Sequence, residues 1–323
     1  MHSDGALLEG RARGPRPAFF FLLGTGRCGS TLVQEVLVRH PEVGFVSNVD
    51  DNLRALRLLG RWNNILYRRV PPRFTSKGGL RFAPSEGWRV LDREIAPLLS
   101  QPFRDLLAED ATPWLADRFR SFFEERARAQ GRPVFVHKFT GWPRSGFVQA
   151  SLPGARFINV VRDGRAVVNS WLQMQWWLGY RGPAAWHYGP LPPAYAAEWE
   201  ASGRSFVTLA GLAWKILMDA FEAARARIPA DHWLDLHYED FLSDPRSHLE
   251  RMLRFVGLEW NAAFERGLAR TSFRTDRQRA YRDEIDGAQL TLLERSLGDH
   301  LARWGYEVKD RADASPASAP SPP

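Results

Sequence analysis

The sequence predicts an α/β fold with three layers, α/β/α, in which helices cover both faces of a central parallel sheet of about five strands. The first observation is that short apolar runs alternate with stretches of helical periodicity along the chain. Helical crossovers between strands produce a parallel sheet that is buried on both faces. The second observation is that the polar clusters come directly after the apolar runs. Ligands of parallel sheets bind at the carboxyl ends of the strands, so the two observations agree.

Five apolar runs supply the expected strands. They are, in chain order, residues 19–23 (FFFLL), 44–47 (GFVS), 133–137 (PVFVH), 157–161 (FINVV) and 233–237 (WLDLH). The run at 157–161 is apolar throughout except for Asn159, which is typical of an interior strand.

Helical periodicity follows these runs and defines the expected helices. One helix begins at residue 30, and another runs from near residue 163 through 171. The others cover residues 114–129, 142–152, 205–227, 245–256 and 289–304. We expect one domain over residues 18–308, with a cap or insertion at 52–104 and an acceptor-side lid at 179–204. The basic residues 1–17 and the Pro/Ala/Ser-rich residues 309–323 are expected to be disordered, because such compositions cannot form a packed core.

Composition limits the classes of function. With 323 residues, 44% of them hydrophobic, the chain can bury a sizeable core, and a single cysteine excludes an intrachain disulfide and a cysteine metal cluster. The formal charge of +7 suits an anionic ligand, but the arginines are spread along the chain, which does not favour nucleic acid. No apolar run approaches the length of a membrane span, and residues 1–17 lack the apolar core of a signal peptide. The expected location is therefore cytoplasmic.

The first motif is the glycine turn between the first strand and the first helix. It is P-loop-like: a strand, a glycine turn and a helix start direct backbone N–H groups and a positive helix end at one spot. Ser30 is expected to be the N-cap of the helix, and Arg27 can add a guanidinium that suits a tetrahedral oxyanion. The residues that we expect to bind phosphate or sulfate here are Gly24, Thr25, Gly26, Arg27, Cys28, Gly29, Ser30 and Thr31.

Other interpretations of this turn stay open. Gly24, Gly26 and Gly29 match the dinucleotide fingerprint G-x-G-x-x-G, which is a weak signal alone. The turn also resembles a Walker A loop, but Ser30 stands where that loop has lysine, which argues against an ordinary nucleotide triphosphatase. A plain tight turn with a solvated Arg27 is the structural alternative. Cys28 is either a reactive thiol near a helix N-terminus or a small residue tolerated beside the ligand.

The second motif is RFINVVRDGRAVVNSW, residues 156–171. Arg162 follows the strand, and Ser170 lies eight residues later, about two helical turns on. An arginine and a hydroxyl placed in this way can share a second phosphate. The alternative is that Arg162 pairs with Asp163 as a structural ion pair.

Together the two motifs resemble the sulfotransferases that use 3′-phosphoadenosine 5′-phosphosulfate (PAPS), especially the tyrosylprotein and bacterial carbohydrate branches. Tyr238-Glu239-Asp240 resembles a segment whose tyrosine lies by the adenine, and residues 271–279 resemble a late basic loop that closes over the nucleotide. The resemblance spans about residues 19–306, with four motifs in the family's order. It implies PAPS as donor, the bisphosphate PAP as product, and no metal. The nucleotide-binding residues that it implies are Arg162, Ser170, Tyr238, Thr271, Ser272, Phe273, Arg274, Arg277 and Arg279.

The base that deprotonates the acceptor is left open by this resemblance. The cytosolic relatives use a histidine after a middle strand, where this chain has His137, and Lys138 matches a lysine that contacts the transferring group in the other branches. Those branches take their base from a glutamate shortly after a His-Pro pair. This chain has Ser47 and Asn48 there, with Asp50 and Asp51 just beyond. We rank Asp51 or Asp50 slightly ahead of His137, whereas the structural alternatives are helix capping for the aspartates and a backbone hydrogen bond for the histidine.

The acceptor is expected to be a hydroxyl (or amine) of a carbohydrate or small molecule. Tryptophans after the second motif can stack on sugars or pack a lid: Trp171, Trp176, Trp177, Trp186 and Trp199. The sequence leaves the oligomeric state open, a homodimer included. Rival functions are a P-loop kinase, a Rossmann oxidoreductase and a non-catalytic sugar- or nucleic-acid-binding protein.

Overall fold

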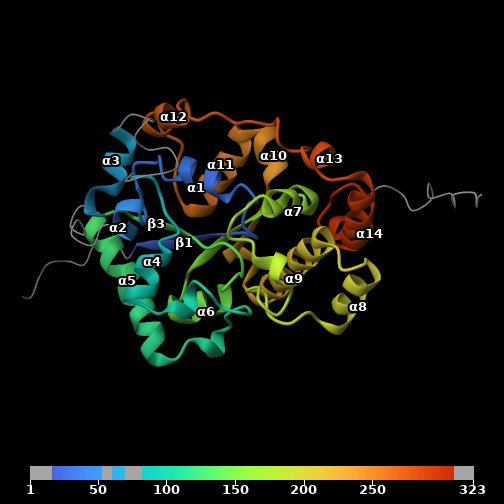
Figure 1. The fold of residues 1–323 in the computed structure, drawn as a ribbon. Helices are drawn as coiled ribbons and strands as arrows, with labels where there is room; N and C mark the ends of the chain where they lie inside the picture. The colour runs from blue at the N-terminus through green and yellow to red at the C-terminus, as the bar shows by residue number, and fades with distance from the viewer. Residues whose placement is uncertain (1–16, 53–59, 70–81, 309–323) are drawn as a thin grey trace, which may run out of the picture. The chain divides into compact units, whose positions relative to one another are not determined.

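The structure of the chain is a computed structural model that describes residues 17–52, 60–69 and 82–308. Its described residues form a five-stranded parallel sheet in the order β2-β3-β1-β4-β5 (Figure 1), so the predicted fold class is confirmed. The strands are β1 (Ala18–Leu23), β2 (Val43–Gly44), β3 (Val134–Lys138), β4 (Arg156–Val161) and β5 (Trp233–His237). Each lies within about three residues of the run that predicted it, a normal uncertainty for strand ends.

The helices agree with the predicted ones wherever the periodicity is long. They are α1 (Ser30–Leu37), α2 (Asn48–Asn52), α3 (Asn63–Arg69), α4 (Trp88–Glu94), α5 (Pro113–Gln130), α6 (Ser145–Ser151), α7 (Gly164–Leu172), α8 (Pro193–Ala201), α9 (Phe206–Arg227), α10 (Tyr238–Ser243), α11 (Pro245–Val256), α12 (Ala262–Leu268), α13 (Tyr281–Glu284) and α14 (Gly287–Arg303). Short 3-10 turns occur at Pro97–Leu99, Ala108–Asp110, Leu178–Arg181 and Ala230–His232.

The chain divides into two compact units. The first consists of Met1–Val161 and Ala220–Thr275 and contains the whole sheet, and the second consists of Arg162–Asp219 and Asp276–Pro323. The predicted disordered ends, and residues 53–59 and 70–81 of the predicted insertion, lie outside the described residues. None of the helices described is both long and apolar enough to cross a membrane.

In the first unit, alternate residues of β1 fill opposite sides of the sheet. Phe20 and Leu22 belong to a core that includes residues of α1, α10 and α11, which lie above the sheet in Figure 1. Phe21 points the other way and contacts the rings of Phe119 and Phe123 on α5, with centroids 6.1 and 5.3 Å away. Burying each such ring stabilises the fold by about 1.5–3 kcal/mol. The side chains thus explain the three layers.

The segment predicted as a cap or insertion contains helices, and one of them, α3, protects the short edge strand β2. Asn64 on α3 donates to the carbonyl groups of Val38, His40 and Val43 at 2.9–3.0 Å. Gln130 of α5 pairs with both backbone groups of Phe45, just beyond β2. These amides occupy backbone groups that would otherwise stay exposed at a sheet edge.

The second unit is held by close helix packing and a polar cluster. Gly164 lies so close to the Trp214 ring that an added Cβ would be 2.9 Å from it. Within the segment predicted to be a lid, Tyr195 of α8 donates to Asp219 at 2.6 Å. Asp219 also accepts from His300 of α14 at 2.8 Å. These bonds attach α8 to the helices on which it lies.

Candidate functional site

The turn after β1 has a backbone that only a glycine-rich sequence adopts easily. Gly26, Arg27 and Gly29 all have positive φ, at 80°, 56° and 92°. Gly29 is also required by space, because an added Cβ would lie 2.1 Å from the ring of Tyr238. Backbones of this kind turn successive N–H groups toward one side and form a concavity for anions. The exposed side chain of Arg27 belongs to the same turn.

The start of α1 corrects one prediction. Ser30 is not the N-cap: it is the first helical residue, and the N-cap is Gly29, which has no side chain to cap the helix. The left-handed conformation at Gly29 ends the turn one residue earlier than the serine preference suggested. The first N–H groups of a helix have no partner within it, so this helix end suits an anion.

Cys28 fills the inside of the turn and is fully buried. An added Cβ on Gly24 would be 2.4 Å from its sulfur and 2.9 Å from the carbonyl oxygen of Val160. The thiol therefore has the surroundings of a small core side chain rather than of an exposed nucleophile. Thr25 and Ser30 are buried beside it.

A polar cluster made of Lys138, Thr31 and Glu86 lies at the end of β3, next to the start of α1. Lys138 Nζ donates to Thr31 Oγ1 at 2.9 Å and is 3.2 Å from Glu86 Oε1. The lysine side chain is only 6% exposed, so its charge is directed at this cluster rather than at solvent. Sequence reasoning missed Glu86. The only signal was a Ser-Glu-Gly turn before an apolar stretch, within a segment that we had expected to be irregular.

His137 points to the opposite side of the sheet from Lys138. It is fully buried, and the rings of Phe21, Phe123 and Phe139 lie 4.8–6.2 Å from its own. Burial, helped by the nearby charge of Lys138, lowers the pKa of His137 to about 3. A neutral imidazole enclosed by rings does not favour a role as base.

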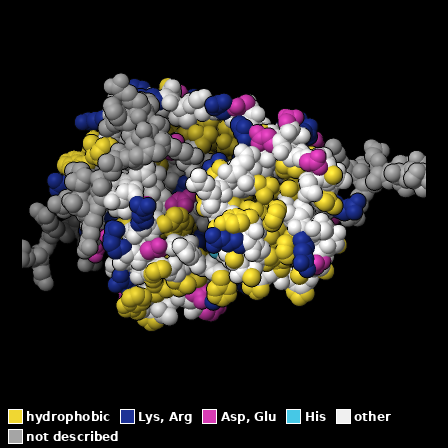
Figure 2. All heavy atoms as spheres, in the orientation of Figure 1, with side chains coloured by type: hydrophobic (Ala, Val, Ile, Leu, Met, Phe, Trp, Pro, Cys, Tyr) yellow, Lys and Arg dark blue, Asp and Glu magenta, His cyan; other side chains and the backbone are white. Residues whose placement is uncertain are grey.

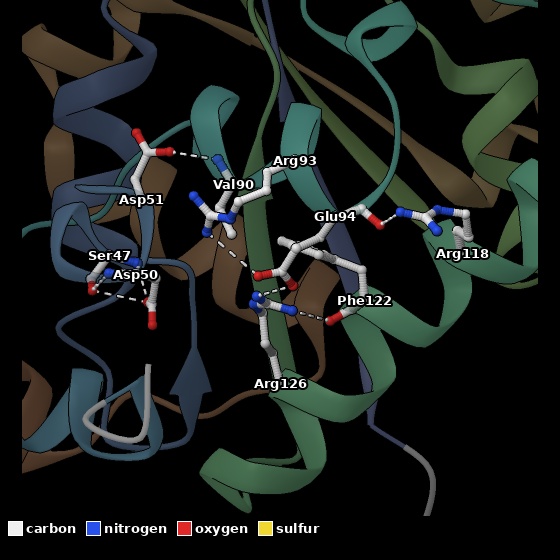
Figure 3. A network of polar contacts seen from close by, with 9 residues as sticks. All are labelled: Ser47, Asp50, Asp51, Val90, Arg93, Glu94, Arg118, Phe122 and Arg126. Carbon is white, nitrogen blue, oxygen red and sulfur yellow. Dashed lines mark hydrogen bonds and ion pairs between the residues drawn. The ribbon is translucent and has the colours of Figure 1, made fainter. Parts of the chain in front are cut away.

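Asp50 and Asp51 both hold local structure (Figure 3). Asp50 accepts from Ser47 N at 2.8 Å while its own N–H donates to Ser47 Oγ at 3.3 Å, which forms a capping box at the start of α2. Asn63 also donates to the Asp50 carboxylate, at 2.6 Å. Asp51 accepts from Val90 N at 3.0 Å, in the first turn of α4, where the N-cap Gly87 offers no side chain. Both aspartates accept from donors at helix starts, but they lie inside α2 rather than at an N-cap before Leu53: Asp50 belongs to the capping box of α2, and Asp51 serves α4.

Tyr238 and Phe273 are both partly buried against the same hydrophobic core of the first unit. Tyr238 lies against Gly29, and Phe241, one turn further along α10, contacts Phe273 with centroids 5.6 Å apart. Phe273 of the late basic loop (residues 271–279) therefore packs against α10, the helix that begins with Tyr238. Thr271 is half-buried there, and Ser272 and Arg274 are exposed.

Arg162, Arg277 and Ser170 all belong to the second unit. Arg162 comes directly after β4 and donates to the carbonyl oxygen of Arg277 at 3.4 Å. Arg277 pairs with Glu284 at 3.0 Å. Asp163 caps α7 and forms an ion pair with Arg165 at 2.8 Å. Ser170 is half-buried on α7, and Arg279 is exposed.

Most of the tryptophans singled out for the acceptor take part in packing. Trp171 is fully buried and stacks on Tyr188, with centroids 5.7 Å apart. Trp186 donates to the Gly189 carbonyl group, and Trp177 is buried. Trp176 is 44% exposed and could meet a ligand.

Positive charge is not gathered into one stripe on the face in Figure 2. Lys and Arg side chains lie there in small groups among acidic and apolar ones. No group of three or more His, Cys, Asp or Glu residues suited to a metal ion occurs within residues 17–52, 60–69 and 82–308.

Comparison with known proteins gives a consistent result. A family model described as the sulfotransferase family matches residues 17–262. A sulfotransferase from Mycobacterium avium is 16% identical over 92% of this chain and 79% of its own, with a TM-score of 0.53. One from Mycobacterium tuberculosis is 16% identical over 88% and 77%, also with a TM-score of 0.53. A sulfotransferase domain from the curacin biosynthetic pathway is 13% identical over 91% and 99%, with a TM-score of 0.50. No curated protein gives a significant match to the sequence.

Proposed function

Because this chain belongs to the sulfotransferase family, and is therefore a transferase, we propose that it moves a sulfuryl group from PAPS to a hydroxyl or amine of an acceptor. PAP is the other product. The acceptor that we propose is a carbohydrate or a small molecule. The one observation that carries the proposal is the contact between Lys138 Nζ and Thr31 Oγ1, 2.9 Å long, at the start of α1.

That contact supports the proposal because it brings three kinds of donor to one place. An ammonium group, a hydroxyl group and the N–H groups of an uncapped helix meet beside the turn that carries Arg27. Charge-assisted hydrogen bonds of this kind are about twice as strong as neutral ones. The absence of a Cβ at Gly29 lets the Tyr238 ring pack directly against the backbone of the turn. The residues present therefore fit the phosphosulfate end of the donor.

The proposed chemistry relies on position and charge. PAPS supplies the sulfuryl group and a phosphate leaving group, and the transfer is expected to have a loose transition state, by analogy with phosphoryl transfer. Arg27, Lys138 and the α1 N-terminus stabilise the negative charge that develops on the leaving side. Because these groups already supply positive charge, the proposed reaction needs no metal ion.

The nucleotide end of the donor is assigned to separate groups of residues. We propose that Tyr238 contacts the adenine, because its ring lies against the glycine turn. Arg162 and Ser170 are proposed to bind the 3′-phosphate. The hydroxyl, ring and cationic side chains of the late loop are proposed to close over the nucleotide: Thr271, Ser272, Phe273, Arg274, Arg277 and Arg279.

A ligand titration tests this function. A ligand of the native state raises the melting temperature, by an amount that depends on its concentration relative to Kd. We expect PAP to raise the melting temperature at concentrations where ATP with magnesium and NAD have little effect, and EDTA to leave that shift unchanged. A larger shift with ATP and magnesium than with PAP would instead support a kinase.

A further inference from the structure

Glu86 occupies a position that the resemblance to known sulfotransferases does not account for. Its Oε1 is 3.2 Å from Lys138 Nζ and accepts from Thr140 Oγ1 at 3.1 Å, and its Oε2 accepts from the indole of Trp88. The side chain is 23% exposed, in contrast to that of Lys138. The carboxylate is therefore fixed in direction, on a side chain that is partly exposed.

Backbone pairing places the segment of Glu86 beside the residues that follow β2. Ser47 and Pro84 form an antiparallel bridge, Asn48 N donates to Ala83 O at 3.0 Å, and Ser85 N donates to Val46 O at 2.8 Å. Ser47 and Asn48 stand where related sulfotransferases have a glutamate. The pairing thus places the segment that carries Glu86 beside Ser47 and Asn48.

We propose that Glu86 is the general base that removes the proton from the acceptor, an inference that rests on the proposed sulfuryl transfer. Among the candidates of the described region, it combines a fixed carboxylate, partial exposure and direct contact with Lys138. Asp50 has three donors on one oxygen, and Asp51 holds the first turn of α4. His137 is enclosed by aromatic rings.

A carboxylate oxygen of Glu86 takes the proton of the acceptor O–H group as the acceptor oxygen forms a bond to sulfur. The bond between sulfur and the bridging oxygen of the donor breaks, and its electron pair stays on the 5′-phosphate of PAP. Lys138, between Glu86 and Thr31, holds the carboxylate beside the anion-binding turn. Arg144 is a further charged group that interacts electrostatically with Glu86.

The test compares three variants with the parent chain. Glu86→Gln removes the base and keeps the shape, Glu86→Asp keeps a carboxylate, and Glu94→Gln is the control. Glu94 lies on α4, the helix that follows Glu86, and pairs with Arg126 at 2.8 Å (Figure 3). A PAP-induced rise in melting temperature, measured for every variant, shows that the variant folds and binds the nucleotide.

The rate of PAP release from PAPS is then measured with phenol and with 4-nitrophenol as probe acceptors at pH 8. Phenols that resemble tyrosine lose their proton near pH 10, whereas 4-nitrophenol is already ionised at pH 8 and needs no base. For Glu86→Gln we expect a rate with phenol that is about 100- to 10,000-fold lower, the usual contribution of a general base. The loss with 4-nitrophenol should be less than about 10-fold. Glu86→Asp should lie between Glu86→Gln and the parent, and Glu94→Gln should match the parent.

Equal losses with the two phenols would assign Glu86 a positioning role and overturn the proposal. If neither phenol raises PAP release above the rate without an added acceptor, that basal rate of PAP release is compared instead. A basal rate for Glu86→Gln within about 3-fold of the parent rate overturns the proposal. A parent chain that neither binds PAP nor releases it from PAPS contradicts the sulfotransferase function itself. The two failures are therefore distinguishable.

Discussion

Gly29 shows how one residue serves both the backbone and the proposed ligand. Its φ of 92° and its contact with Tyr238 together leave no room for a side chain. The sequence pattern predicted a glycine turn at this place, because glycines between a strand and a helix are a local signal. It could not predict that Tyr238, more than 200 positions away, would lie against the turn.

Gly29→Ala is predicted to destabilise the protein and to weaken PAP binding, because the new methyl group would displace Tyr238 or the turn. The matched control is Gly131→Ala, whose φ is 59° and whose added Cβ meets nothing within 4 Å. Backbone strain alone should lower the free energy of unfolding of the control by about 1 kcal/mol. Gly29→Ala should lower it by at least about 1 kcal/mol more, as measured by denaturant unfolding. Equal losses, with PAP binding unchanged in both variants, would contradict the close contact at Gly29.

His137 is predicted to make stability depend on pH. Its pKa is about 3 in the folded protein and near 6.5 when unfolded, so below pH 6.5 the unfolded chain takes up a proton that the folded chain does not. Stability should therefore fall as the pH drops from about 6.5 toward 3, by up to about 1.4 kcal/mol per pH unit from this group. Urea unfolding at pH 7 and pH 5 should show a smaller fall for His137→Phe than for the parent chain. An identical fall would contradict the depressed pKa, and loss of PAPS turnover in His137→Phe despite normal PAP binding would return the base role to His137.

At the scale of elements, α4 is positioned by a side chain from another helix. Its N-cap is Gly87, and the missing acceptor comes from Asp51, whose carboxylate points at Val90 in Figure 3. Local sequence signals could not predict this cap, because donor and acceptor are 39 residues apart. For the same reason the sequence missed Glu86, whose partner Thr140 is 54 residues away. The long strands and helices were predictable because their apolar periodicity is local.

Asp51→Ala is predicted to destabilise the protein by about 0.5–2 kcal/mol, the usual cost of losing a helix cap. It should also slow PAPS turnover, since α4 follows Glu86 directly. Asn52→Ala is the control. Asn52 is exposed and contacts Arg89 at 2.9 Å, so this variant should lose no more than about 0.5 kcal/mol of unfolding free energy. Denaturant unfolding gives both values. Equal stabilities for the two variants would show that the bond to Val90 contributes little.

At the scale of the whole molecule, the chain divides into two compact units, each of which carries residues that the sequence motifs single out. Lys138, Tyr238 and the glycine turn belong to the first unit, and Arg162 and Ser170 to the second. The position of Arg162 after a strand and its spacing to Ser170 predicted a phosphate site, whereas the roles of Lys138 and Tyr238 came only from the resemblance to sulfotransferases; all four roles stay predictions. The sequence did not predict the division into two units, because each unit is formed by two segments that are far apart in the sequence.

Arg162→Ala is predicted to weaken the binding of PAP by about 10- to 100-fold, as expected for loss of a charge-assisted hydrogen bond to phosphate. The affinity for adenosine 5′-phosphate, which lacks the 3′-phosphate, should change little. Calorimetric titration of both nucleotides separates the two cases. Equal weakening for both nucleotides would place Arg162 away from the 3′-phosphate.

The most direct test of the proposed sulfuryl transfer is the rate at which the chain converts PAPS to PAP. We predict that the parent protein releases PAP, and that Arg27→Ala and Lys138→Ala each lower the rate by about 10- to 1,000-fold at saturating donor, the range for losing one strong donor to the leaving group. Release of PAP at the same rate by the parent and both variants would contradict the account.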